Sequence, residues 1–233
     1  MRKALWLLLI PGASFSQPVR PVLPGCGVRP QLRVIHILGG AGGTGFKFAW
    51  KGREYVATNQ HVAEGQTLLA AEDEDGRTAT LRYLTGKESP EQPPEVPKTG
   101  YYSDWAVLDI VEGRLDATVL RLSRATDVHE GPAYARGFPY KKLMDTDLLV
   151  HAYQGRLLAG QMASVMWFGA SGSPVVDCAG EVVGANYGTC REPRCFRQED
   201  DLVYFSPQPP AGELGLMQNR LTPVQALIEL LEP

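Results

Sequence analysis

The sequence predicts an all-β protein of two strand-rich halves, with one helix at its C-terminal end. The 233 residues include 25 glycines and 18 prolines, so turns are frequent and only short apolar runs lie between them. These runs are rich in Val, Ile, Phe, Tyr and Thr, the residue types that favour strands. With 44% hydrophobic residues, the chain can bury one sizeable core or two small cores that share an interface.

Residues 1–16 have the pattern of a cleaved signal peptide. Arg2 and Lys3 are followed by an apolar run that begins at Ala4 and ends at Ile10, and small residues precede a cut after Ser16. The run is much shorter than the roughly 20 residues that span a bilayer, and a buried N-terminal strand is the alternative. Cleavage removes two positive charges and changes the formal net charge from −3 to −5. No polybasic run is present, so we expect a secreted or periplasmic protein that binds neither nucleic acid nor, after cleavage, a membrane.

The four cysteines of a secreted chain are expected to form disulfides. Cys26, Cys178, Cys190 and Cys195 allow three connectivities. We expect Cys190–Cys195 to close a loop and Cys26–Cys178 to tie the N-terminal arm to a hairpin tip. A zinc site is disfavoured because no C-x-x-C and no histidine pair lies nearby, and Cys26 lies too far beyond the apolar run for lipidation. Neither a metal nor another cofactor is expected.

Six strands are predicted in the first half of the chain. They cover residues 33–38, 45–50, 54–59, 67–71, 78–83 and 105–110. The acidic run 72–75 resembles a calcium loop, but Arg77 stands where such a loop needs a ligand, so a solvated turn is predicted. Residues 85–100, with four prolines, are predicted to form a surface loop, and residues 114–127 to cross to the second half.

The second half repeats this pattern and ends in a helix. Its predicted strands cover residues 133–137, 148–153, 156–166, 173–176, 181–186 and 202–205. For the final helix, Thr222 is predicted to be the N-cap, Pro223 the first helical residue and Gln225 the partner that completes a capping box. An apolar stripe along this helix predicts that it docks onto the second half; the stripe consists of Val224, Leu227, Ile228 and Leu231.

Of the four histidines, His61 is the strongest candidate for chemistry. His36 and His151 lie inside apolar runs, which predicts buried or half-buried structural roles, and His129 lies in an ordinary loop. His61 ends a strand-like run, just before a tight turn predicted at residues 62–65, so its side chain is free to project into a cleft. Taken alone, a histidine in this position does not identify a catalytic site.

Asp104 and Ser171 are candidates of the same kind. Asp104 precedes a strongly apolar strand, and a carboxylate drawn into the interior needs a donor such as a histidine ring N–H; a turn-capping surface aspartate is the alternative. Ser171 lies in GASGSP (169–174), where Gly169 lets the backbone turn its N–H inward, Gly172 is expected to clear space for a substrate chain, and Pro174 fixes the exit of the loop. A nucleophilic serine needs a nearby base and N–H groups aimed at the oxyanion, whereas an ordinary turn needs neither.

In the order His61, Asp104, Ser171 these signals resemble the chymotrypsin-like (trypsin-like) serine peptidases. The resemblance is to the bacterial secreted branch that includes glutamyl endopeptidases and Deg-type heat-shock proteases. It covers about residues 34–205, through GTGFKF (43–48), ATNQHVA (57–63), SDWAVLDI (103–110), ARGFPY (135–140) and GASGSPVVDCAGEVVGANYG (169–188). It implies two antiparallel β-barrels with the active site in the cleft between them. The first barrel and N-terminal arm would then occupy residues 17–118, and the second barrel and helix residues 119–233.

The resemblance also implies a role for each candidate residue. His61 would be the general base, Asp104 its orienting partner and Ser171, rather than Ser173, the nucleophile. The backbone N–H groups of Gly169 and Ser171 would form the oxyanion hole. Substrate would contact the segments before the nucleophile and on the following strand, at Val165, Trp167, Asn186, Tyr187 and Gly188.

Two positions depart from trypsin-type members of the family. Val165 stands where those enzymes carry an acidic residue, which favours an apolar or small substrate side chain over Arg or Lys. Ala170 stands where many zymogens carry an aspartate that pairs with a newly cut N-terminus, which predicts that this activation switch is absent.

The sequence therefore predicts a secreted serine endopeptidase that cleaves polypeptides through an acyl-enzyme. A catalytically silent protease-like binding or scaffold protein is the alternative. An esterase of another fold is disfavoured, because its nucleophile elbow requires the order Ser, Asp, His.

Overall fold

The computed structural model describes residues 26–88, 103–124, 131–151, 161–162, 169–190 and 218–232. The helices are α1 (Gln60–Ala63), the 3-10 turn η1 (Pro139–Lys141) and α2 (Val224–Leu231). The strands are β1 (Ile35–Ile37), β2 (Gly43–Trp50), β3 (Arg53–Thr58), β4 (Leu68–Asp73), β5 (Thr78–Glu88), β6 (Asp104–Gly113), β7 (Val119–Leu122), β8 (Gly131–Gly137), β9 (Met144–His151), β10 (Gln161–Met162), β11 (Pro174–Asp177), β12 (Glu181–Cys190) and β13 (Gln218–Pro223).

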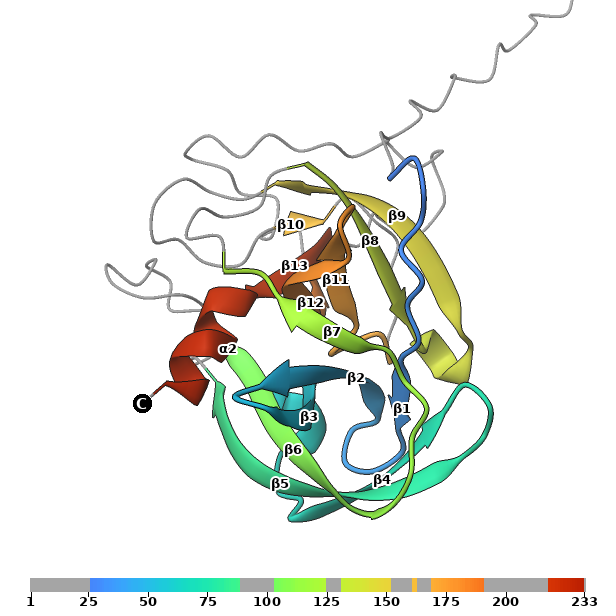
Figure 1. Ribbon diagram of the computed structural model, residues 1–233, viewed down its shortest axis with the longest axis vertical. Helices are drawn as coiled ribbons and strands as arrows, with labels where there is room; N and C mark the ends of the chain where they lie inside the picture. The colour runs from blue at the N-terminus through green and yellow to red at the C-terminus, as the bar shows by residue number, and fades with distance from the viewer. Residues whose placement is uncertain are drawn as a thin grey trace, which may run out of the picture.

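The strands close into two antiparallel rings. In the first, the order β1-β4-β5-β6-β3-β2 is closed by the β1–β2 pair. In the second, the order β12-β11-β8-β9-β10-β13 is closed by the β12–β13 pair. Strand β7 lies between the rings and pairs in parallel with β2 and β12 (Figure 1). The predicted all-β fold of two antiparallel barrels with a C-terminal helix is thereby confirmed.

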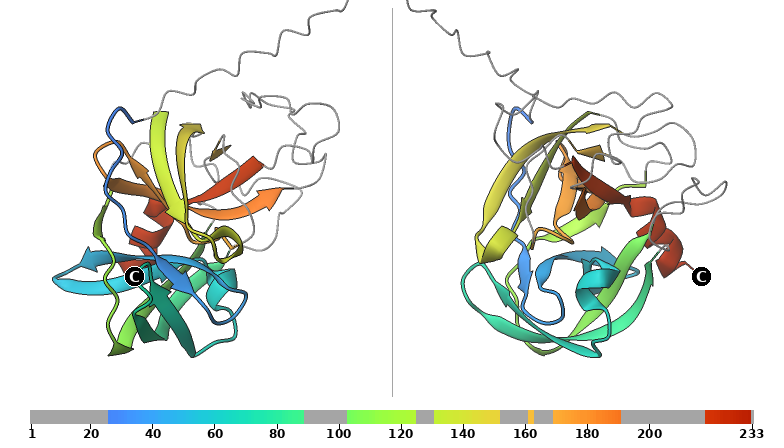
Figure 2. Two further views of the ribbon diagram at one scale, coloured as in Figure 1. Left: turned by 90° about the vertical axis from the view of Figure 1, so that its right-hand side faces the viewer. Right: turned by 180° about the vertical axis from the view of Figure 1, so that it is seen from behind.

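Three hydrophobic clusters are buried in the described residues, and the two larger ones span the barrels. One lies inside the first barrel and includes Ile35, Leu81 and Leu108, all fully buried. The other joins both barrels with α2, which lies at their boundary (Figure 2). In it the ring of Trp105 meets that of Phe46 edge-on at 6.1 Å between ring centroids, and apolar side chains of α2 pack onto the same cluster. The barrels are therefore fixed to each other by shared apolar burial.

Some predicted boundaries of strands, turns and helices differ from those in the structure, because contacts distant in the sequence determine the backbone conformation there. His61 was expected to end a strand before a tight turn at residues 62–65, but β3 ends at Thr58 and His61 lies in the short helix α1, so that the turn is confined to residues 64 and 65. Strand β5 continues to Glu88, into the predicted surface loop. Thr222 does not cap α2; it lies in β13, a strand not predicted, and its hydroxyl accepts the N–H of Asp104 instead. The predicted strand 202–205 and His129 lie outside the described residues.

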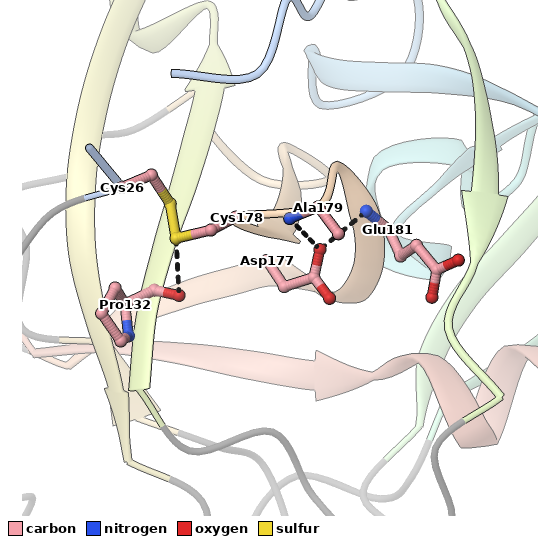
Figure 3. Close-up of a disulfide and its surroundings, with 6 residues drawn as sticks. All are labelled: Cys26, Pro132, Asp177, Cys178, Ala179 and Glu181. Atoms are coloured by element: carbon pink, nitrogen blue, oxygen red, sulfur yellow. Dashed lines mark hydrogen bonds between the residues drawn. A yellow bond between two sulfur atoms is a disulfide. The ribbon is translucent and has the colours of Figure 1, made fainter. Parts of the chain in front are cut away.

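A disulfide anchors the N-terminal arm (residues 26–34) to the second barrel. Cys26 is bonded to Cys178 at the tip of the β11–β12 hairpin (Figure 3), which confirms this predicted pairing. The hairpin tip is shaped by Asp177, whose carboxylate accepts the N–H groups of Ala179 and Glu181. The other predicted bridge involves Cys195, which lies outside the described residues.

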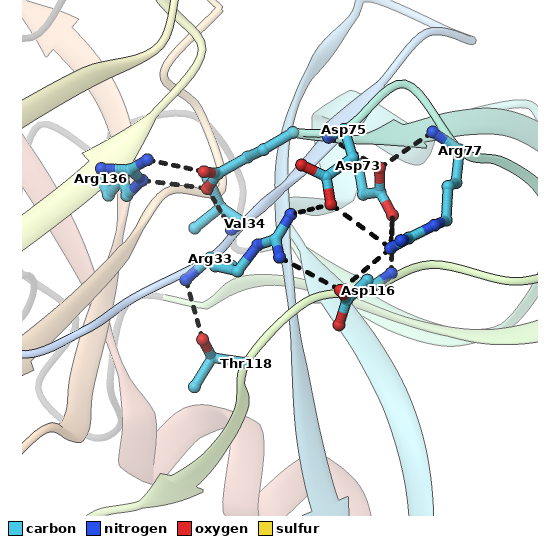
Figure 4. Close-up of polar contacts among 9 residues, drawn as sticks. Arg33, Val34, Asp73, Asp75, Arg77, Asp116, Thr118 and Arg136 are labelled. Atoms are coloured by element: carbon cyan, nitrogen blue, oxygen red, sulfur yellow. Dashed lines mark hydrogen bonds and ion pairs between the residues drawn. The ribbon is translucent and has the colours of Figure 1, made fainter.

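The turn between β4 and β5 forms a polar cluster with the arm and the second barrel (Figure 4). From β8, Arg136 donates to both carboxylate oxygens of Glu74, at 2.9 and 2.6 Å, and Glu74 also accepts the N–H of Val34. The paired Glu74 raises the pKa of the Arg136 guanidinium despite its partial burial. The turn is therefore not simply solvated, as the sequence suggested, but an ionic contact between the two barrels.

Asp73 is the buried residue of this turn. Burial alone would raise the pKa of Asp73, but hydrogen bonds from the N–H groups of Asp116, Arg77 and Asp75 outweigh it and lower the pKa below 3.8. Its side chain is fully buried, and these donors satisfy both carboxylate oxygens. The charged form of Asp73 thus stabilises the turn.

We predict that replacing both Cys26 and Cys178 by Ser lowers the free energy of unfolding by about 2–5 kcal/mol. The bridge joins residues 152 positions apart, so its loss releases a long loop in the unfolded chain. Denaturant unfolding of the wild type and the double variant, followed by tryptophan fluorescence without reductant, measures the difference. Equal midpoints and slopes would show that the bridge contributes nothing to stability.

We also predict that Asp73→Asn destabilises the fold by about 1–3 kcal/mol at pH 7, because the amide supplies only one acceptor oxygen. Since the folded pKa of Asp73 is lowered, its contribution is present above pH 3.8 and is lost as the pH falls below that value. The gap between variant and wild type should therefore shrink in acid. Asp75→Asn is the matched control, because Asp75 lies in the same turn but is half exposed. An Asp73→Asn effect that does not change with pH would contradict the prediction.

Candidate active site

The β3–β6 pair brings His61 and Asp104 to the same end of the first barrel. Thr58 at the end of β3 pairs with Ala106 near the start of β6, so the residues just beyond them become neighbours. Asn59, with extended backbone, then begins α1, and its carbonyl accepts the N–H of Val62. The short helix thereby turns His61 back toward Asp104, the first residue of β6.

His61 and Asp104 form a close two-point contact. The ring Nδ1 of His61 lies 2.6 Å from Oδ2 of Asp104, and the backbone N–H of His61 donates to Oδ1 at 3.1 Å. Asp104 is fully buried, whereas 31% of the His61 side chain is exposed. An ionised carboxylate only accepts hydrogen bonds, so a ring paired with ionised Asp104 donates from Nδ1, and Nε2 is then the nitrogen that can act as a base.

Two buried side chains hold the backbone of Asp104. The Nδ2 group of Asn59 donates to the carbonyl of Asp104 at 2.7 Å. The backbone N–H of Asp104 donates to the hydroxyl of Thr222 at 3.2 Å. Asn59 belongs to the first barrel and Thr222 to β13 of the second, and both are fully buried. The position of Asp104 therefore depends on both barrels.

The loop that carries Ser171 is fixed from two sides. On the second barrel, the N–H of Gly172 donates to the carbonyl of Asn186 at 2.7 Å, and the N–H of Asn186 donates to Ser173 at 2.9 Å. On the first barrel, the N–H of Thr44 donates to the carbonyl of Ser171 at 2.7 Å. The loop thus bridges β2 and β12, so its place reflects the fit between the barrels.

Two glycines allow this loop to form. Gly169 has φ +92° and Gly172 has φ +82°, a region that L side chains rarely adopt. A Cβ at Gly172 would also clash with the carbonyl oxygen of Thr44 and the hydroxyl of Thr58. The spacing of glycines in GASGSP is therefore required by the backbone itself.

The Ser171 backbone lies beside the helix that carries His61. A Cβ placed on Gly43 would meet the Ser171 carbonyl oxygen at 2.9 Å and the side chain of Val62 at 2.8 Å. Val62 follows His61 directly, so Ser171 and α1 approach the same point of β2. The three residues singled out by the sequence come from both barrels to one region.

The two serines of the loop differ in exposure. Ser173 is fully buried, and its hydroxyl faces Gly137, where a Cβ would overlap it. Ser171 is only partly buried. A reactant entering from solvent therefore reaches Ser171 more readily than Ser173.

The predicted substrate-binding residues are only partly described. Asn186 is buried in β12, and its backbone joins the Ser171 loop as given above. Tyr187 and Gly188 continue β12, which pairs with β13 there, while Val165 and Trp167 lie outside the described residues.

Within the described ranges, no group of three or more His, Cys, Asp or Glu side chains is placed to hold a metal ion. None of the helices described is long and apolar enough to cross a membrane.

Sequence reasoning missed the residues that hold the candidates in place. Thr58 and Asn59 lie inside ATNQHVA, so the stretch was noticed but their roles were not. The hydroxyl of Thr44 accepts the N–H of Phe138 and donates to the carbonyl of Gly169. Thr222 gave no signal, because it lies 118 positions from Asp104 and a helix cap explained it equally well.

Comparison with known proteins agrees with this fold. The model of the trypsin-like peptidase domain family matches residues 43–184. A search of curated proteins found no match.

Three similar solved structures are proteases. The serine endoprotease from Yersinia pestis is 19% identical, with a TM-score of 0.56 over 87% of this chain and 62% of that one. The Rv3671c protease in its inactive form is 17% identical, with a TM-score of 0.56 over 85% of this chain and 87% of that one. The HtrA-type protease AlgW, solved with a decapeptide, is 20% identical, with a TM-score of 0.53 over 82% of this chain and 50% of that one.

The chain thus spans less than two thirds of the Yersinia pestis and AlgW chains, and at these identities the likeness concerns the fold. The family match is broader evidence, because its 142 positions cover more than half of the 233 residues and include His61, Asp104 and Ser171. On this match, the chain belongs to the trypsin-like peptidase family.

Proposed function

We propose that this protein is a serine endopeptidase in which His61, Asp104 and Ser171 act as a catalytic triad. The observation that carries the proposal is the pairing of the fully buried Asp104 with the ring of the partly exposed His61 at 2.6 Å. A buried carboxylate held by the two N–H groups of one histidine fixes the ring tautomer, which is what a general base requires. The partial exposure of Ser171 supports it as the nucleophile in preference to Ser173.

The proposed reaction proceeds by acyl transfer. His61 accepts the hydroxyl proton of Ser171 as the oxygen attacks the scissile carbonyl, and Asp104 stabilises the imidazolium that forms. The N–H groups of Gly169 and Ser171 bind the oxyanion. His61 then protonates the leaving amine, and the C–N bond breaks to give the acyl-enzyme. Water, activated by His61, hydrolyses the ester and restores Ser171.

The proposed substrates are polypeptides in an extended conformation. The backbone of Tyr187 and Gly188 in β12 would pair with the substrate as an added strand. Asn186, also expected to do so, instead has its N–H and carbonyl bonded to Ser173 and Gly172 of the nucleophile loop. Val165 and Trp167 would favour an apolar or small side chain before the cut. The Cys26–Cys178 bridge supports secretion or a periplasmic location, since disulfides persist in oxidising compartments.

We predict that a fluorophosphonate probe labels the wild type and Ser173→Ala but not Ser171→Ala. The probe esterifies an activated serine, and loss of Ser171 should lower kcat toward peptides on the order of 10⁶-fold. Gel fluorescence and intact mass measure the labelling. Labelling that survives Ser171→Ala but is lost in Ser173→Ala would overturn the assignment, and a folded wild type that is not labelled would favour a silent scaffold.

We predict that Asp104→Asn lowers the labelling rate by about 10⁴-fold, because an amide can donate to Nδ1 and so select the wrong ring tautomer. Asp109→Asn is the matched control: Asp109 lies on the same strand but pairs with Arg82 and Arg53, away from His61. Stopped-time labelling across a range of probe concentrations measures both rates. Similar rates for the two variants would contradict the role proposed for Asp104.

A further inference from the structure

Asp104 is held by a residue from the far end of the chain. Its backbone N–H donates to the hydroxyl of Thr222 at 3.2 Å, and the indole N–H of the next residue, Trp105, donates to the carbonyl of Pro223 at 3.0 Å. All of these groups are buried. A buried N–H that loses its acceptor costs free energy, so both contacts hold the start of β6 against the end of β13.

Thr222 is itself linked to the loop of Ser171. In the β12–β13 pair, Thr222 lies opposite Ala185, and Leu221 lies opposite Asn186. The carbonyl of Asn186 accepts the N–H of Gly172, and the N–H of Asn186 donates to the carbonyl of Ser173; these are the two residues that follow Ser171. One pair of strands therefore holds the nucleophile loop through Asn186 and the strand of Asp104 through Thr222.

From this arrangement we propose that Thr222 is a positioning residue, whose hydroxyl fixes Asp104, and through it His61, relative to Ser171. The inference rests on the proposed triad and adds to it a residue that touches neither substrate nor the reacting atoms. Since Asp104 contacts His61 through both carboxylate oxygens, a shift of its backbone is passed directly to the ring. Displacements of about 1 Å at such a distance from the chemistry are enough to slow a reaction 100-fold.

The test compares Thr222→Val, which removes the hydroxyl at nearly constant shape, with Thr222→Ser, which keeps it. We expect Thr222→Val to lower the maximal inactivation rate by a fluorophosphonate about 10-fold to 100-fold, with little change in the probe concentration that gives half of this rate. Thr222→Ser should recover most of the loss. Thr222→Ala, paired with Thr222→Ser, isolates the hydroxyl if the valine variant does not fold, and circular dichroism establishes folding.

Thr118→Val is the matched control, because the Thr118 hydroxyl likewise accepts a distant backbone N–H, that of Arg33 at 2.8 Å, but in the N-terminal arm rather than at Asp104. It should leave the inactivation rate unchanged. A second readout is independent of activity: the low-field NMR resonance of the His61 Nδ1 proton should shift or broaden in Thr222→Val and Thr222→Ala but not in Thr222→Ser or Thr118→Val.

A folded Thr222→Val with the wild-type rate, or with a slower rate but an unmoved Nδ1 resonance, would overturn the inference. So would a Thr222→Ser variant as slow as Thr222→Ala. If the wild type does not react with the probe at all, the proposed function fails, while the resonance still decides whether Thr222 positions the His61–Asp104 pair.

Discussion

The buried carboxylate of Asp104 is the constraint on which the rest of this site depends. Taking a charge out of water costs several kcal/mol unless donors surround it. Within the described part of the chain, both donors to this carboxylate come from His61, through its ring and its backbone. The hydrogen bonds that offset the burial of Asp104 therefore also fix the histidine. Asn59 and Thr222 complete the arrangement by satisfying the backbone of Asp104.

The position of Ser171 depends on how the two barrels fit together. Ser171 belongs to the second barrel, yet its carbonyl accepts an N–H from Thr44 on β2, and Thr44 also bonds to Gly169 and Phe138. The ionic pair of Glu74 and Arg136 joins the barrels on another side, and the disulfide-anchored arm joins them on a third. The relative position of His61 and Ser171 is thus set by several contacts at once, which limits how far either can move.

Sequence reasoning reached the parts that local pattern determines. Short runs rich in Val, Ile, Phe, Tyr and Thr between turns predicted the strands, and the order of His61, Asp104 and Ser171 indicated the family. It failed where a side chain bonds to a residue distant in the sequence. Thr222 has the features of a helix cap, but its hydroxyl accepts the N–H of Asp104. Glu74 has the features of a solvated charge in an acidic turn, but its carboxylate pairs with Arg136. Neither partner is visible from local spacing, because each lies more than 60 positions away.

The loop of Ser171 (residues 169–174) carries Ala170 at the position where many zymogens have an aspartate. Ala170 is fully buried in a small apolar cluster with Ala135, Val175 and Leu221. An aspartate there would place a carboxylate among these side chains, which is favourable only if a cation follows it inside. In this chain the loop is instead shaped by backbone bonds: Ser173 donates to Ala170, and Gly172 to Asn186. With the bond from the N–H of Thr44 in the first barrel to the carbonyl of Ser171, the loop is shaped by backbone contacts with both barrels rather than by a buried ion pair.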